Sequence, residues 1–201
     1  MMRSLLLIGI ALTLSGNSST PNNEFTVALI SIDGANFEEV KQIKRNIRAY
    51  YNCNVNELLP ITIPFELMKN GQDTVLSSSL LRYLRKTYKE SEFDKIVAIT
   101  EKPLYFTEQF PSIRGLGTQN GKTAVISTFK IKNEASEDKK FYKSLLLKVT
   151  RHEIGHTLGL AHCKRNSKCL MTSGVNPEEF YSLQSTFCDS CKVQVQRYLK
   201  E

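Results

Sequence analysis

All three histidines of this 201-residue chain lie within eleven positions, in the segment RHEIGHTLGLAHC at residues 151–163. On a helix, His152 and His156 of the H-E-x-x-H pattern lie one turn apart, so both imidazoles can reach one metal ion. Glu153 follows the first histidine and can act as general base on a metal-bound water. The pattern therefore favours a catalytic metal site over a buried helix that carries histidines incidentally.

A third protein ligand is needed, because two histidines leave a zinc ion under-coordinated. Gly159 can adopt positive φ and end the helix, and the turn after it would bring His162 to the same ion. Three nitrogen ligands leave the fourth position open for water, which is typical of catalytic zinc. We expect the zinc to polarise a scissile carbonyl while Glu153 takes a proton from the water.

Four of the five cysteines lie in the last quarter of the chain, in the pattern C-x5-C followed by C-x-x-C. A C-x-x-C loop presents two sulfurs to one ion, which favours a second, structural zinc site. Two disulfides are the alternative if the chain is exported. Cys53 stands apart and is assigned to the core. The proposed structural ligands are Cys163, Cys169, Cys188 and Cys191.

Strand and helix patterns alternate before the histidines, which indicates an α+β fold with a mixed sheet covered by helices. The helix that carries the histidines is expected to begin near Glu137. Leu147, Ile154 and Leu158 would form its core-facing stripe, and Leu145 and Val149 would share a second stripe with the histidines. Strands are predicted at 24–33, 94–101 and 123–131, helices at 35–51 and 74–88, and a strand with irregular structure at 53–68.

Two segments are expected to contact a substrate. Residues 121–131, GKTAVISTFKI, are the hypothesised edge strand on which an extended peptide adds. The pocket wall is expected to come from residues 103–117 and from the segment after Met171. Tyr181 could donate a hydrogen bond to the reaction intermediate, although a surface or packing role is the simpler interpretation.

The N-terminal residues 1–18 have the pattern of a signal peptide: Arg3, an apolar run of ten residues from Leu5 to Leu14, and a small, polar exit. An apolar run of this length is too short to span a bilayer, which takes about 20 residues. We therefore predict a secreted or periplasmic protein without stable membrane insertion after cleavage. An uncleaved anchor and a cytoplasmic location are the alternatives.

The formal charge of +7 could indicate a nucleic-acid partner, but the basic residues are spread along the chain. No nucleic-acid binding is expected, and the chain is predicted to be a monomer of one domain over residues 24–201. Within it, residues 24–159 would form the N-terminal subdomain and residues 160–201 the C-terminal one.

The chain resembles the archaemetzincins, a metzincin family of zinc metallopeptidases, in HEIGHTLGLAHC, in Cys169-Leu170-Met171 and in Cys188-Asp189-Ser190-Cys191. The resemblance implies a metzincin-like fold: a twisted mixed sheet, an active-site helix, a Met-turn at Met171 and a small C-terminal helical subdomain. It also implies two Zn²⁺ per chain, with peptides or proteins as substrates. A zinc-dependent binding or scaffold protein that lost turnover is the alternative function.

Overall fold

The computed structural model describes residues 25–69, 73–173 and 176–199, and its centre is a five-stranded sheet in the order β2-β1-β4-β7-β6. Four strands run parallel, and only β6, at one edge, is antiparallel to its neighbour β7. A separate parallel pair is formed by β3 (Val75–Leu76) and β5 (Leu104–Tyr105). The five strands are β1 (Thr26–Ile32), β2 (Asn54–Glu57), β4 (Lys95–Thr100), β6 (Gly115–Gly117) and β7 (Thr123–Ser127).

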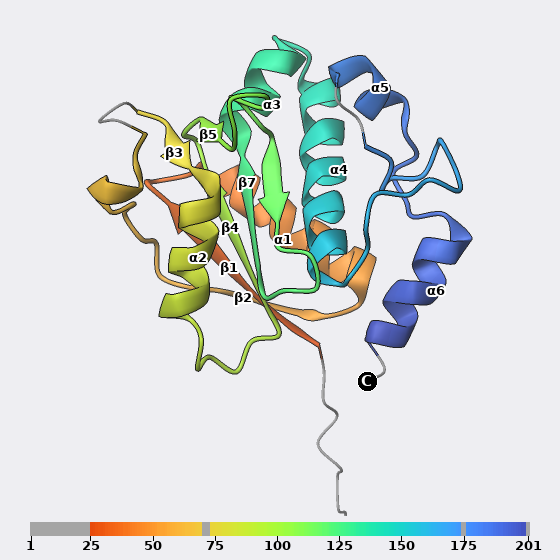
Figure 1. Ribbon diagram of the computed structural model, residues 1–201, viewed down its shortest axis with the longest axis horizontal. Helices are drawn as coiled ribbons and strands as arrows, with labels where there is room; N and C mark the ends of the chain where they lie inside the picture. Colours follow the sequence, from red (N-terminus) through yellow and green to blue (C-terminus); the bar gives the residue numbers. More distant parts are fainter. Residues whose placement is uncertain (1–24, 70–72, 174–175, 200–201) are drawn as a thin grey trace, which may run out of the picture.

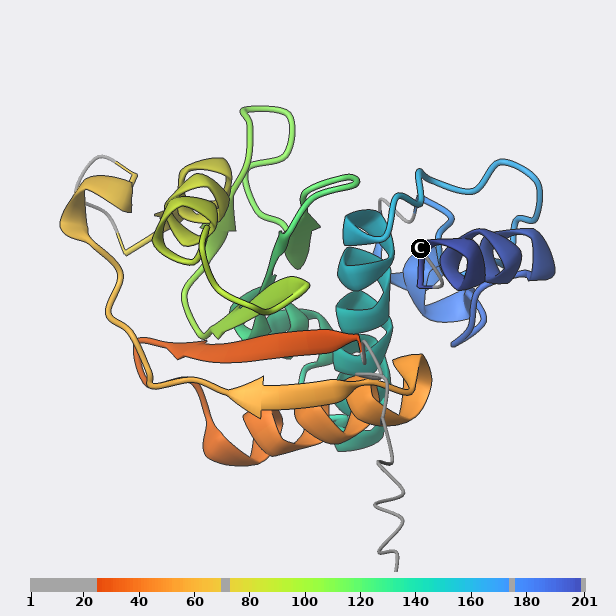
Figure 2. The same ribbon diagram turned by 90° about the horizontal axis from the view of Figure 1, so that it is seen from below.

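Helices cover both faces of the sheet (Figure 2). The side chains of β1 alternate: Val27 and Leu29 pack with one group of helices, and Ala28 and Ile30 pack with the opposite one. α1 (Phe37–Tyr51), α3 (Thr128–Ala135) and α4 (Lys139–Thr157) cover the first face, and α2 (Ser77–Thr87) covers the second.

The remaining elements follow α4 along the chain. α5 (Pro177–Ser182) and α6 (Asp189–Tyr198) lie beyond α4, on the side away from α2, as both views show (Figures 1 and 2). One short 3-10 helix, Phe65–Leu67, lies between β2 and β3. The predicted α+β class, with a mixed sheet covered by helices, is confirmed.

The prediction for residues 121–131 is wrong in two respects. The strand β7 ends at Ser127, and α3 begins at Thr128, because Ile131 and Ala135 are buried four residues apart, on one face of a helix. β7 is also interior: it pairs with β4 and β6, and all five of its residues are buried. The edge strand on this side of the sheet is β6, and its sequence GLG carries no strand pattern.

Smaller differences concern individual side chains. Phe37, the first residue of α1, is 63% exposed although it is aromatic. Leu146 rather than Leu147 is fully buried, since the face of α4 that meets the sheet contains Leu145, Leu146 and Val149.

The predicted signal peptide at residues 1–18 lies outside the described residues. Within the part of the chain that the structure describes, no helix is both long and apolar enough to cross a membrane.

Candidate active site

Helix α4 carries two of the three histidines, and hydrogen bonds cap both of its ends. The Asp138 carboxylate caps the first turn by accepting hydrogen bonds from the backbone N–H groups of Lys140 and Phe141, each at 2.9 Å. At the other end Gly159 has φ of +85°, and the Leu160 N–H donates to the Gly155 carbonyl at 3.0 Å. The predicted start near Glu137 and the helix end at Gly159 are both confirmed.

The turn after Gly159 brings the third histidine back to the first two. The Nε2 atoms of His152 and His156 lie 3.1 Å apart, and one ring nitrogen of each histidine lies within 4.8 Å of the others. Ligands about 2.0–2.1 Å from a tetrahedral zinc would be about 3.3 Å apart, so this spacing suits one ion. His162 is exposed while His152 is buried, which leaves the group open to solvent on one side.

Backbone carbonyls orient two of the rings. The Nδ1 atom of His152 donates to the Leu170 carbonyl, and that of His156 donates to the Leu160 carbonyl, both at 2.8 Å. Because each Nδ1 carries the proton, each Nε2 keeps its lone pair for a metal. Burial lowers the pKa of all three imidazoles, that of His152 to about 3. Neutral imidazoles, the form that binds metal, are therefore favoured.

Glu153 is buried against the edge strand β6. Burial raises the pKa of its carboxyl to about 8, against the opposing effects of the Gly117 N–H, which donates to it, and the Arg114 guanidinium. The close approach depends on two glycines. A Cβ on Gly115 would lie 2.8 Å from the Glu153 Cγ, and one on Gly117 would lie 2.3 Å from the Glu153 carbonyl oxygen. The sequence GLG is thus explained by contact with α4.

The three histidines and Glu153 line one cavity of about 400 Å³. Residues of the loop before β6 and of β6 itself form one wall, and Ser173 and Phe180 contribute from the segment after Met171. The expected origin of the pocket walls is therefore confirmed. Arg114 lies within the expected wall, residues 103–117, and Val149 lies on the stripe expected beside the histidines; both line the cavity. Lys130 also lines the cavity, but from the helix α3 and not from the strand expected at residues 121–131.

Met171 is fully buried beneath the histidine helix. A Cβ on Gly155 would lie 2.6 Å from the Met171 sulfur, so the glycine makes room for it. The chain turns tightly there, since the Thr172 N–H donates to the Cys169 carbonyl at 2.9 Å. The Met171 carbonyl in turn accepts from the Cys163 N–H at 2.8 Å.

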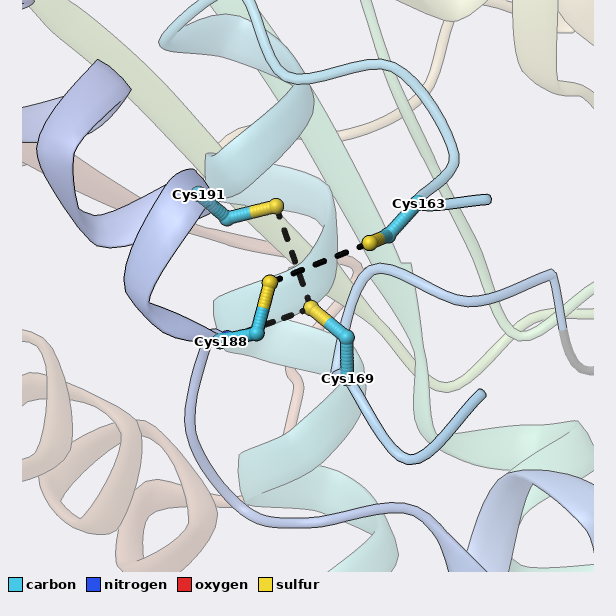
Figure 3. Close-up of side chains that lie close together, drawn as sticks. All are labelled: Cys163, Cys169, Cys188 and Cys191. Atoms are coloured by element: carbon cyan, nitrogen blue, oxygen red, sulfur yellow. Dashed lines mark hydrogen bonds between the residues drawn. The ribbon is translucent and has the colours of Figure 1, made fainter. Parts of the chain in front are cut away.

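The four late cysteines converge at one point (Figure 3). The sulfurs of Cys163 and Cys188 are 3.8 Å apart, as are those of Cys169 and Cys191, and all four lie within 4.8 Å of one another. A disulfide requires about 2.05 Å. Thiolates about 2.3 Å from a tetrahedral zinc would be about 3.8 Å apart. The arrangement fits a closed four-sulfur metal site.

Two other residues named from the sequence lie elsewhere. The Cys53 thiol is buried near the Ile47 carbonyl, and burial raises its pKa to about 11, in line with the assignment to the core. Tyr181 is 49% exposed, and its ring packs edge-on against the Phe141 ring with the two ring centroids 4.3 Å apart. Its backbone carbonyl accepts a hydrogen bond from the Lys148 ammonium. It is not among the residues that line the cavity. The structure therefore favours the packing interpretation of Tyr181.

Comparisons with known proteins agree with this geometry. The sequence profile of Peptidase family M54 matches residues 38–197. The chain is similar to the archaemetzincin of Natronomonas pharaonis, with 27% identity over 163 residues that cover 77% of this chain and 90% of the relative. It is also similar to the archaemetzincin of Haloarcula marismortui, with 28% identity over 166 residues that cover 77% and 92%.

Solved structures show the same fold. The crystal structure of archaemetzincin from Methanopyrus kandleri superposes with a TM-score of 0.76 at 24% identity, covering 91% of this chain and 99% of that one. The archaemetzincin of Archaeoglobus fulgidus, crystallised with malonate, gives a TM-score of 0.72 at 22% identity, covering 85% and 99%.

Proposed function

The chain belongs to peptidase family M54, the archaemetzincin family of zinc metallopeptidases, and we propose that Glu153 is the general base of its peptide hydrolysis. The Nε2 atoms of His152, His156 and His162 would hold the catalytic zinc. Zinc bound there supplies Lewis-acid polarisation of a carbonyl and lowers the pKa of water towards about 7.

Glu153 is the observation that carries the proposal. Its carboxyl lies beside the histidine group and receives the Gly117 N–H, so its position is fixed by the edge strand. A carboxylate so placed takes the proton of the attacking water and transfers it to the nitrogen of the departing amine. A metal site without turnover would have no need for a buried carboxyl held in this way.

The edge strand β6 suits the binding of an extended peptide. It is one of the two terminal strands of the five-stranded sheet, and Gly115, Leu116 and Gly117 all line the cavity. A substrate that adds to this edge would pair through main-chain hydrogen bonds, which tolerate many sequences. The role first assigned to residues 121–131 thus passes to β6.

The cysteine group would hold a second zinc with a structural role. Four thiolates fill a tetrahedral site and leave no position for a substrate or water. Cys163 follows His162 directly, and Cys169 lies two residues before Met171. A zinc at this site would fix the segment that packs beneath α4. Two Zn²⁺ per chain are thus expected, with Met171 as the residue of the Met-turn.

A cleavage assay with a mixed peptide library tests the proposal. Protein as purified should cleave, chelated protein should not, and zinc added back should restore cleavage. Glu153→Ala should be inactive while it retains the metal. Cleavage unaffected by both chelation and Glu153→Ala would contradict the proposal. Zinc-dependent peptide binding without any cleavage would support the binding or scaffold alternative instead.

Export is proposed from the signal-like sequence at residues 1–18 alone. It predicts that the mature protein lacks this segment and is recovered outside the cytoplasm. Cell fractionation with mass measurement of the intact chain tests this, and a full-length cytoplasmic protein would contradict it.

A further inference from the structure

The catalytic cavity extends from the histidines along α4 towards α3. Val149 lies one helical turn before His152 and lines the cavity, and the Phe180 ring stands 5.6 Å from the His152 ring. The cavity also reaches Lys130 of α3 and Arg114, which directly precedes β6. It is thus apolar next to the metal ligands and cationic at the α3 side.

The positive charges on the α3 side exceed the negative ones. The Nε atom of Arg114 lies 2.5 Å from a Glu134 carboxylate oxygen, whereas the Nζ atom of Lys130 lies 3.9 Å from the other oxygen. Lys130 also donates to the Ser112 carbonyl at 2.5 Å. One carboxylate therefore faces two cations and lies closer to the arginine.

Glu134 offsets only one of these two positive charges. It is not among the described residues that line the cavity, and the one acidic residue among them is Glu153, beside the histidines. Lys130 is partly buried, with 27% of its side chain exposed. Burial lowers the pKa of its ammonium below the ordinary value, although the Glu134 carboxylate opposes that shift. An additional anion would stabilise this lysine.

We infer that the cavity selects a substrate residue with a carboxylate side chain, which pairs with Lys130 while its methylene groups pack on Val149 and Phe180. The inference rests on the proposed peptidase function and names the substrate class of the same site. A charge-assisted hydrogen bond in a partly buried site is strong enough to decide specificity. A long apolar residue would instead cover the ammonium without compensating it.

Matched peptides test the inference. Each position around the scissile bond is occupied in turn by Glu, Gln, Leu or Lys, and kcat/KM is measured for each peptide. At one position the wild-type protein should prefer Glu over Gln by about tenfold. Lys130→Met should bring that ratio close to one, Lys130→Arg should preserve it, and Lys130→Glu should favour the Lys peptide.

Lys143→Met is the matched control, because it removes the same charge from an exposed position on α4. It should leave the ratio unchanged. Zinc content and thermal unfolding of each variant establish that the site is intact. A wild-type ratio near one at every position would overturn the inference, and so would a preference for Glu that survives in Lys130→Met.

A binding measurement separates this inference from the proposed function. Glu153→Gln protein is titrated with the same peptides, and their dissociation constants are compared with those for Glu153→Gln combined with Lys130→Met. Preferential binding of the Glu peptide that depends on Lys130 would support the inference even if wild-type protein cleaved nothing. If the protein cleaved the Glu and Gln peptides equally well, the peptidase function would stand and the role of Lys130 would be wrong.

Discussion

The Nδ1 atom of His152 donates a hydrogen bond to the carbonyl of Leu170 at 2.8 Å, and this bond connects the histidine group to the cysteine group. Leu170 stands between Cys169, one of the four converging cysteines, and Met171, which packs beneath α4. His162 and Cys163 are adjacent in the chain. The orientation of one histidine and the position of another thus depend on the segment that the cysteines hold.

This connection predicts the effect of Cys169→Ser. Loss of one sulfur would open the closed site, release the turn at Leu170 and weaken binding of the catalytic metal by about 10–100-fold, as for other groups that orient ligands. Metal content and hydrolysis should both fall. Cys53→Ala, which removes a buried thiol far from the group in sequence, should retain both. Full activity and full metal content in Cys169→Ser would contradict the coupling.

Gly117→Ala tests the contact between β6 and α4. The added methyl would lie 2.3 Å from the Glu153 carbonyl oxygen and 3.0 Å from the His156 Cβ, so the strand must move away from the helix. We expect a loss of about 1–3 kcal/mol in the free energy of unfolding and a larger relative loss of hydrolysis. The control is Gly121→Ala, because the three atoms nearest to its added methyl all belong to Thr118. Unchanged kinetics in Gly117→Ala would show that the contact is not required.

The buried Glu153 predicts how the stability of the metal-free protein depends on pH. Burial raises the pKa of the Glu153 carboxyl from an ordinary 4.5 to about 8 in the folded protein. Between pH 4.5 and pH 8 the folded protein therefore holds a proton on Glu153 that the unfolded chain has released. Stability therefore falls as pH rises through this window. The lowered pKa values of the histidines act in the opposite sense, below their ordinary 6.5.

Between pH 6.5 and 8, Glu153 is therefore expected to lower the stability by about 2 kcal/mol. Denaturant unfolding of chelated wild-type protein at both pH values measures the effect, and chelated Glu153→Gln supplies the baseline. If the free energy of unfolding changed equally between pH 6.5 and 8 in the two proteins, the Glu153 carboxyl would already be ionised at pH 6.5.

Tyr181→Phe should leave hydrolysis within about twofold of wild type, since the hydroxyl lies outside the cavity lining and the ring still packs on Phe141. Steady-state kinetics with one peptide suffices. If Tyr181→Phe lost 100-fold or more of the hydrolysis rate at unchanged metal content, Tyr181 would instead act as a hydrogen-bond donor to the reaction intermediate.

The sequence predicted the parts of the site that depend on local spacing. His152, Glu153 and His156 follow helical periodicity, and Gly159 ends the helix through its own φ. The grouping of the four cysteines was also accessible, because metal ligands have characteristic spacing.

The sequence did not predict that residues 115–117 form a strand or that Lys130 belongs to a helix. Three residues with two glycines give no strand pattern, and their place is set by contact with Glu153, far along the chain. The helical position of Lys130 was missed because the apolar residues of 123–131 continue from the strand β7 into the helix α3 without a break in their pattern. Only tertiary packing decides that boundary.

The substitution Glu153→Gln decides whether Glu153 is the general base at a zinc site. This change keeps the size of the side chain and removes its ability to accept a proton. Peptide hydrolysis and zinc per chain are measured on the same preparation beside wild type. We predict a fall of about 10²–10⁴-fold in kcat at equal zinc content. Hydrolysis at the wild-type rate with full zinc content would contradict the claim.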